Sequence, residues 1–550
     1  MAVKIQTIQN FLGFGDGLKR GEYYYSQGMG CSREGIKPNW VMIKSIDNGT
    51  LAELQLIKWF DQRKEAGSIY IYAVACNGKI FKVDWPGNDW TLARTPTTNN
   101  DGNGLIVDQK NRVLYAQDQY LGMYDGTTWT DNWKDFVVDI GSKWRPMDLY
   151  EDWVVMGNKN KIALLNITDD SFNANAFNLS DEFEIVALKS GKNGVLIGAN
   201  IGSRSVLVLW DCQATRSIAP WTWIEGNIFG IAKYEGQWIV SVGNEIFITN
   251  GYTQRYLITP VDLSIQDSDF GPYYPSGMLV RNFYLFINGG WDSLSRKKTG
   301  LWIYNLRTQL WEFCSPSNFC LRHVTPGALF IDNKWFFYAS YQTDLPNKIY
   351  IEKIWNSAPS KSFYISPPLG VGDNQKIAEG LILNLGFDLA DYTDKTLPNW
   401  KIIAGIYDFK KPLWKYGRTT AASTEANKLK INGTYYSADV GDEVTILEGA
   451  NASEIRHIIA ITGKGTVDEV WTLDSDLPNL TEQDVFLNIC PFRKIGEWTI
   501  NNYPIKNYYY FPIKNLASGR KFLIKVYFKV ANLTPELHSL SFIYDDLGIL

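Results

Sequence analysis

With 550 residues, the chain is too long to bury one compact core, so we expect two or three domains. Aromatic residues make up 14% of the sequence and helix-forming runs are scarce, which favours strands. The net charge of −4 and the lack of a Lys/Arg cluster argue against stable binding to a nucleic acid. No apolar run suits an export signal or a membrane span, so the sequence predicts a protein made in a reducing cytoplasm without a membrane anchor.

The residues that commonly bind metals are sparse. The six cysteines are few for this length and irregularly spaced, which indicates free thiols. Cys314 and Cys320 are the nearest pair, but a zinc site there needs two more ligands, and His323 alone does not supply them. Residues 99–104 offer oxygen atoms but lack the downstream Glu of a calcium loop. We therefore predict no metal site and no cofactor.

The first residues, 1–39, are rich in Gly and Tyr, as in the stretches 11–17 and 23–25. Closely spaced glycines favour turns over regular elements. We expect this segment to be an extended N-terminal arm.

Residues 40–368 repeat one short phrase: an apolar strand, an Asp or Asn at a turn, and an aromatic residue that opens the next strand. The turn residues are Asp84, Asp125, Asn166, Asp211, Asn250 and Asn305. They follow one another at steps of 41, 41, 45, 39 and 55 residues. A four-stranded antiparallel blade of a β-propeller takes roughly 40 to 50 residues, so the spacing predicts one blade per repeat.

A second turn precedes the repeated Asp or Asn, as at Asn77 and Gly78, which both tolerate positive φ. The segments between turns alternate or run nearly all apolar, which is typical of half-buried outer strands and buried inner strands. Residues 335–338 and 349–351 supply a last blade. The sequence therefore predicts an all-β fold that begins with a seven-bladed β-propeller, and six blades are the alternative.

The period ends at about residue 368, although strands continue beyond it. We expect a C-terminal β-sandwich made of residues 369–426 and 494–550. Residues 427–493 carry their own short strands and are predicted to form a small β-barrel inserted into the sandwich. Such an insertion costs little, because the entropy of closing a loop grows slowly with its length.

The clearest C-terminal strand covers residues 522–530. Its apolar side chains share one face, and three lysines lie on the other, namely Lys521, Lys525 and Lys529. This alternation predicts a strand with one buried face and one solvated face.

The chain offers no constellation of residues suited to catalysis. Its three histidines, His323, His457 and His538, fall in different predicted domains, whereas a catalytic base must lie within hydrogen-bond reach of its nucleophile. The glycine-rich stretches 13–17 and 463–466 lack the features of phosphate-binding loops. We therefore predict that the protein is not an enzyme and has no catalytic or cofactor-binding residues.

Sugar hydrolysis is the enzymatic alternative, because propellers host many hydrolases that place paired carboxylates at their centre. Residues 124–129 are similar to the tail of a sialidase Asp-box, but Tyr124 stands where that motif has Asp, and Gly122 where it has Ser. We interpret this stretch as a structural turn of a blade.

Several stretches resemble the propeller-bearing virion proteins of tailed bacteriophages, including the nozzle and tail-hub proteins of short-tailed phages. Residues 9–13 and 18–22 look like their N-terminal opening, a Phe-x-Gly arm followed by a Gly and a short polar stretch. Residues 441–456 are similar to a small barrel that recurs in phage proteins, usually with Gly in place of Ser453. Residues 518–542 resemble the last strands of the sandwich that follows such propellers.

The resemblance implies a structural protein of the virion tail, made in the cytoplasm of a bacterial host and present in several copies around a symmetry axis. It would act as a rigid scaffold, as a conduit for DNA, or as both. Its implied partners are copies of itself and other tail or portal-adaptor proteins, with DNA passing only transiently. One alternative is a receptor-binding or glycan-recognising tail protein, since Trp and Tyr stack on sugars. A polysaccharide-degrading propeller enzyme is the other.

Overall fold

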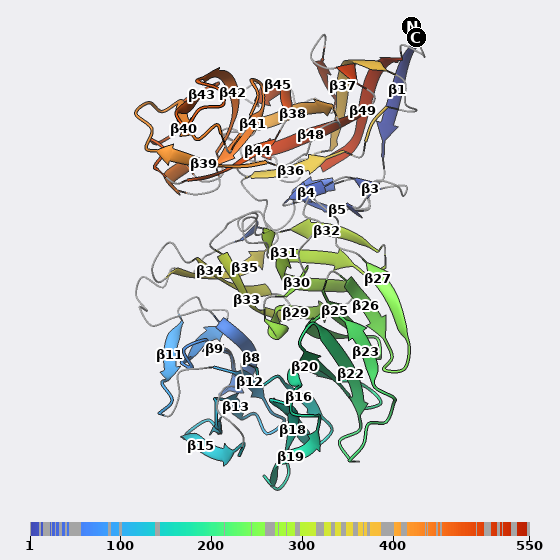
Figure 1. Ribbon diagram of the computed structural model, residues 1–550, viewed down its shortest axis with the longest axis vertical. Coiled ribbons are helices and arrows are strands. Elements are labelled where there is room, and N and C mark those ends of the chain that lie inside the picture. Colours follow the sequence, from blue (N-terminus) through green and yellow to red (C-terminus); the bar gives the residue numbers. More distant parts are fainter. Residues whose placement is uncertain are drawn as a thin grey trace.

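In the computed structural model the chain is built almost entirely of β-strands (Figure 1). The structure describes residues 57–258 with gaps at 86–89, 98–101, 138–143, 214 and 244, most of 270–386, residues 401–408, most of 415–529, residues 536–546 and short pieces of the first 42 residues. The helical elements given for this part of the chain are two short 3-10 turns, η1 (Pro275–Gly277) and η3 (Gly449–Asn451). The prediction of an all-β fold is confirmed.

The described parts of residues 57–258 form five antiparallel sheets, each made of four strands that follow one another in the chain. The first contains β8 (Ile57–Glu65), β9 (Ser68–Ala75), β10 (Ile80–Trp85) and β11 (Thr91–Arg94). The second contains β12 (Gly104–Val107), β13 (Val113–Ala116), β14 (Tyr120–Tyr124) and β15 (Trp129–Asp135). The third contains β16 (Met147–Tyr150), β17 (Trp153–Asn158), β18 (Lys161–Asn166) and β19 (Phe172–Asn178). The fourth contains β20 (Glu184–Ser190), β21 (Val195–Ile201), β22 (Arg204–Trp210) and β23 (Thr222–Glu225). The fifth contains β24 (Ile228–Tyr234), β25 (Gln237–Val242), β26 (Glu245–Thr249) and β27 (Gln254–Ile258).

Two further sheets follow, and both recruit strands from the first 42 residues. The sixth contains β28 (Phe270–Pro272), β29 (Met278–Arg281), β30 (Tyr284–Trp291), β31 (Lys298–Asn305) and β32 (Leu310–Cys314), joined by β2 (Gly13–Phe14) and β3 (Glu22–Tyr23). The seventh contains β33 (Val324–Ile331), β34 (Phe336–Gln342) and β35 (Lys348–Trp355), joined by β7 (Val41–Met42).

One strand near the start of each sheet faces the centre of this region, where Figure 1 shows these strands close together in the lower half of the molecule. Each central strand contacts that of the next sheet, and the last contacts the first, in the order β8, β12, β16, β20, β24, β29, β33 and back to β8. The contacts therefore run in a closed circle. Strand β7, which precedes the first sheet in the chain, completes the sheet that comes last, with Val41 opposite Trp355 and Met42 opposite Ile354.

The repeated Asp or Asn lies at a turn in five of the six repeats. In five of the six repeats its side-chain oxygen accepts the backbone N–H two residues later, at 2.7 to 3.0 Å, and these residues are Asp125, Asn166, Asp211, Asn250 and Asn305. Each of these turns joins two successive strands of its sheet, namely β14 and β15, β18 and β19, β22 and β23, β26 and β27, or β31 and β32. Local bonding of this kind is what makes Asp and Asn favoured turn residues. The sixth repeat residue, Asp84, lies inside β10, and residues 86–89 fall outside the described part of the chain.

Large side chains fill the spaces between neighbouring sheets. Between the third and fourth sheets, Phe177 and Trp210 contact each other with ring centroids 5.2 Å apart, and both are buried. Between the second and third sheets lies Arg145, whose side chain is fully buried. Its guanidinium donates hydrogen bonds to the carbonyl oxygens of Gln117 and Asp118 and to the side chain of Asn158. A buried guanidinium needs such acceptors, so Arg145 fixes the second sheet against the third.

The C-terminal part contains two more sheets. One contains β1 (Ala2–Ile8), β5 (Met29–Cys31), β6 (Ile36–Pro38), β37 (Lys376–Gly386), β46 (Tyr508–Pro512), β47 (Ser518–Gly519) and β49 (Glu536–Asp546). The other contains β4 (Tyr25–Gln27), β36 (Lys361–Ile365), β38 (Lys401–Asp408), β45 (Arg493–Thr499) and β48 (Phe522–Lys529). The buried rings of Phe522 and Phe542 contact each other across the two sheets, with centroids 5.3 Å apart.

A closed barrel adjoins these sheets, at the upper left of Figure 1. Its strands are β39 (Lys415–Ala421), β40 (Lys428–Ile431), β43 (Glu469–Leu473), β42 (Ile455–Thr462), β41 (Glu443–Ile446) and β44 (Phe486–Cys490), in the order in which they pair. Its core is apolar around the fully buried Trp471, whose indole N–H donates to Glu469.

Three sequence expectations differ from this arrangement. The described strands of residues 1–39 do not form a separate extended arm, because they join sheets formed by much later residues. Strand β36 pairs with β48, so the repeat region ends before Lys361 rather than at residue 368. The barrel begins with β39 at Lys415 rather than at residue 427. In each case the partner strand, and not the local sequence pattern, decides where the segment belongs.

The lysine face of β48 is a further correction. Lys521 is exposed as predicted, but the side chain of Lys525 is only 3% exposed. Its Nζ lies 2.5 Å from Oε1 of Glu443 in the barrel, which is also buried. The face of β48 predicted to be solvated is therefore only partly exposed, because the barrel covers it at Lys525.

Candidate functional site

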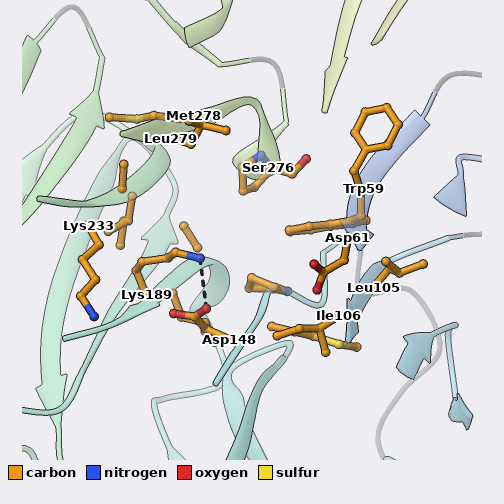
Figure 2. A pocket seen from close by; sticks show the side chains of 18 of the residues that line it. Trp59, Asp61, Leu105, Ile106, Asp148, Lys189, Lys233, Ser276, Met278 and Leu279 are labelled. Carbon is orange, nitrogen blue, oxygen red and sulfur yellow. Dashed lines mark hydrogen bonds and ion pairs between the residues drawn. The ribbon is translucent and has the colours of Figure 1, made fainter. Parts of the chain in front are cut away.

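A pocket of about 430 Å³ lies where the central strands of the repeated sheets converge (Figure 2). Residues of β8, β12, β16, β20, β24, η1 and β29 line it. We call it the central pocket. Most of these strands contribute three consecutive residues, such as 59–61 of β8 and 187–189 of β20, so the pocket is not lined by a single face of each strand.

The walls of the central pocket are mostly apolar. The principal apolar residues are Trp59, Leu105, Ile106, Met147, Leu188, Ile231, Met278 and Leu279. Four charged residues also line it, namely Asp61, Asp148, Lys189 and Lys233. An apolar cavity with a few polar groups is the usual form of a small-molecule site.

Asp61 is held by backbone donors. Its Oδ1 accepts the N–H of Gln62 and its Oδ2 accepts the N–H of Val107 in the next sheet, each at 2.7 Å. Burial raises the pKa of Asp61 to about 6, and the charge of nearby Asp148 adds to this, whereas the backbone hydrogen bonds and Lys189 oppose it. Over the residues that the structure describes, Asp61 has no ion-pair partner.

Asp148 repeats part of this pattern two sheets later. Its Oδ2 accepts the N–H of Ser190 in the next sheet at 2.6 Å, and its Oδ1 lies 3.1 Å from Nζ of Lys189. Figure 2 shows Lys189 reaching Asp148 from the neighbouring strand. Asp61 and Asp148 therefore both link one central strand to the next, and Asp148 is in addition paired with a cation.

Two other polar groups complete the pocket. The indole N–H of Trp59 is buried and has no hydrogen-bond partner among the residues that the structure describes. Ser276 points into the same space, and its hydroxyl donates to the carbonyl oxygen of Lys58. Lys233 is exposed to solvent.

These carboxylates bear on the glycosidase alternative. Burial raises the pKa of Asp61 to about 6, a value that suits a proton donor. However, each of its oxygens is already bonded to a backbone N–H, and Asp148 is occupied by Lys189 and Ser190. The arrangement is better suited to holding charge and linking strands than to transferring a proton to a sugar.

None of the residues of the central pocket is predicted as a site from the sequence. Trp59 and Asp61 lie on the same face of β8. An acidic residue on the same face as a buried Trp is the feature of the sequence that could have indicated a site. What could not be read locally is that strands from six sheets enclose that face.

The positions considered for chemistry lie apart from the central pocket. His457 is buried in the barrel, where its Nδ1 lies 3.5 Å from Oδ2 of Asp474. Cys212 is buried, which raises the pKa of its thiol to about 12 and leaves it unreactive. Cys320 and His323 lie outside the described residues, as do the side chains of Cys314 and of residues 13–17. Within the described part of the chain, no group of His, Cys, Asp and Glu is arranged to hold a metal ion.

Two glycine-containing stretches are structural turns, as interpreted from the sequence. Residues 463–466 connect β42 to β43, and the N–H of Thr466 donates to the carbonyl oxygen of Gly463 at 3.0 Å. Residues 124–129 form the turn of Asp125, whose carboxylate accepts the N–H groups of Thr127 and Thr128. The calcium candidate at 99–104 lies partly outside the described residues.

Comparisons with known proteins give no family. No protein-family model and no curated protein matches the chain. Similar solved structures include the β-propeller domain of Cps50 (Swd1) from Myceliophteria thermophila, with 10% identity over 58% of this chain and 99% of that one at a TM-score of 0.40. YCF48 bound to D1 peptide has 11% identity over 58% and 94% of the two chains at 0.39. The AfRom2 CNH domain has 9% identity over 58% and 99% at 0.37.

At such identities and TM-scores these likenesses carry no argument about function. Among the described residues, no helix is long and apolar enough to span a membrane.

Proposed function

We propose that this chain is a structural protein of a bacteriophage tail, a nozzle or hub component that assembles in several copies and is not an enzyme. The observation that carries the proposal is the way the first 42 residues tie the molecule together. They supply strands to the sixth and seventh repeated sheets and to both C-terminal sheets. A protein whose sheets are linked in this way is suited to transmit mechanical force between neighbouring subunits.

In this proposal the seven repeated sheets are the blades of one propeller. The closed circle of contacts between central strands supports that count. So does β7, which adds a strand from the start of the chain to the last sheet. A closed ring has few exposed sheet edges, which makes it a rigid platform that resists uncontrolled pairing with other strands.

The two C-terminal sheets form the proposed sandwich, and the barrel is inserted between β38 and β45. The ring contact of Phe522 with Phe542 supports face-to-face packing of the two sheets. The buried pair of Lys525 and Glu443 fixes the barrel to the sandwich. The sandwich and barrel thus present additional rigid faces to neighbouring copies and to other tail or adaptor proteins.

A conduit for DNA would run between copies of the chain rather than through one propeller. The central pocket has a volume of about 430 Å³, which is the size of a small-molecule site. The major groove of B-DNA alone is about 12 Å wide, so a duplex has no room among these side chains. The proposed role therefore requires several copies around an axis.

Purified chain and purified phage particles together test this function. Mass photometry of the chain, with cryo-electron microscopy of the particle, is expected to show a ring of several copies at the tail. A chain that stays monomeric and is absent from the particle by mass spectrometry would refute the proposal.

Glycan recognition by a tail protein is the second candidate, and one observation favours it. Trp221 and Trp223, at the outer strand of the fourth sheet, are 37% and 58% exposed. Exposed aromatic faces of this kind stack on sugar rings. Binding on a glycan array that Trp223→Ala abolishes would support this role, and an array without any signal would exclude it for the glycans tested.

A further inference from the structure

The central pocket encloses a carboxylate whose neighbours within bonding distance are neutral. Asp61 receives two backbone N–H groups, one on each oxygen, and forms no ion pair within the described part of the chain. We propose that the central pocket binds a small organic cation, with an ammonium group at Asp61 and an apolar body against Trp59. This inference goes beyond the proposed tail function and does not depend on it.

Among the charged residues that line the pocket, Asp61 is the one whose charge a ligand can neutralise. Asp148 and Lys189 lie 3.1 Å apart and cancel each other. Lys233 is exposed, so water and salt screen its charge. Each oxygen of Asp61 accepts one backbone N–H, so the carboxylate keeps further lone pairs that an ammonium group in the pocket can use.

Trp59 supplies the second element of recognition. It lies two residues before Asp61 on the same face of β8, and Figure 2 shows both residues on one wall of the pocket. The face of an indole ring attracts ammonium groups, most strongly where water is excluded.

The volume and walls set the size of the ligand. About 430 Å³ accommodates one small molecule, and the apolar residues that line the pocket include Leu188, Ile231 and Leu279. A compact apolar group carrying one ammonium fits this composition. A polyanion or a long sugar chain does not.

Three probes of matched shape test the inference on the full-length chain by isothermal titration calorimetry at pH 7.5. They are benzylammonium, the neutral benzyl alcohol and the anion benzoate. Benzylammonium is expected to bind at least ten-fold more tightly than benzyl alcohol, and benzoate more weakly than either. Equal affinity for the cation and the alcohol, tighter binding of benzoate, or no heat from benzylammonium at millimolar concentration would overturn the inference.

Variants then locate the site. Asp61→Asn is expected to remove the ten-fold preference for the cation, whereas Glu182→Gln, in an exposed loop, is expected to keep it. Trp59→Leu provides a second readout should Asp61→Asn fail to fold, and a loss of at least five-fold in affinity for benzylammonium is expected. Unchanged binding in a folded variant of either pocket residue would refute the assignment. A chain that binds benzylammonium but is absent from phage particles would uphold this inference and refute the tail function.

Discussion

The buried pair of Lys525 and Glu443 shows how one residue can depart from its sequence pattern. The alternation of residues 522–530 places Lys525 with Lys521 on a solvated face, and Lys521 is indeed exposed. Lys525 is instead covered by the barrel and paired with Glu443, and its Nζ lies 5.9 Å from the centre of the Phe492 ring. Residues beyond the strand decide which part of its polar face meets water.

Removing one charge of this pair is expected to be costly. In Glu443→Gln the Lys525 ammonium stays buried but loses its carboxylate, and such changes cost about 3 to 5 kcal/mol. Scanning calorimetry should show the transition of the C-terminal part at lower temperature. The matched control is Glu425→Gln, which breaks the exposed pair with Lys428 and should cost less than about 1 kcal/mol. Equal effects of the two changes would show that the buried pair adds nothing.

Asp61 gives a pH-dependent prediction with a definite sign. Its pKa is raised from 3.8 to about 6 in the folded protein, so the folded state holds this proton more tightly than the unfolded state. The stability of the wild-type chain relative to Asp61→Asn should therefore fall as the pH rises from 3.8 to about 6 and then level off. Thermal midpoints measured between pH 4.5 and 7.5 test this.

Asp125→Asn is the control for that series. Hydrogen bonds from Thr128 and Thr127 lower the pKa of Asp125 to about 2, so its contribution is lost only in stronger acid. The difference between wild type and Asp125→Asn should stay constant over the same pH range. A difference for Asp61→Asn that is equally flat would show that Asp61 titrates normally.

At the scale of elements, the sequence predicts the turns better than it predicts which strands pair. Asp125, Asn166, Asp211, Asn250 and Asn305 recur because each bonds the backbone two residues later, which is local chemistry and therefore legible in the sequence. Strands such as β2 and β3, two residues long, have no period of their own; β2 pairs with the edge of β32, and β3 pairs with β2. The enclosure of Asp61 was equally hidden, because it depends on strands from six sheets.

Removal of one such turn side chain should weaken its hairpin modestly. In Asn250→Ala the N–H groups of Tyr252 and Thr253 lose their acceptor, each at 2.9 Å, and the expected cost is about 1 kcal/mol. Asn250→Asp keeps the acceptor and should stay close to wild type in thermal unfolding. If Ala and Asp variants unfold alike, the side-chain bond is not what stabilises the turn.

At the scale of the whole molecule, the order of the sheets depends on contacts between the two ends of the repeat region. Strand β7 precedes β8 in the chain, yet it pairs with β35 of the last sheet, and β8 itself contacts β33. The circle is therefore closed twice, once at its centre and once at its outer edge. If the circle of sheets were open, the pairing of residues 41 and 42 with β35 would not link the two ends of the repeat region.

A cross-link across that closure tests it directly. Met42 stands opposite Ile354, and directly opposed residues of an antiparallel pair have Cβ atoms roughly 4.5 to 5.5 Å apart, close to disulfide geometry. Met42→Cys with Ile354→Cys should form an intramolecular disulfide under mild oxidation, seen by mass spectrometry of peptides. It should also raise the thermal midpoint, because a cross-link between distant residues restricts the unfolded chain. Such a cross-link typically adds about 2 to 4 kcal/mol to the free energy of unfolding.

Val41→Cys with Ile354→Cys is the out-of-register control. It should cross-link far less, since neighbouring side chains on a strand point to opposite faces. Equal cross-linking of both pairs, or of neither, would mean that the N-terminal strand does not close the ring in this register.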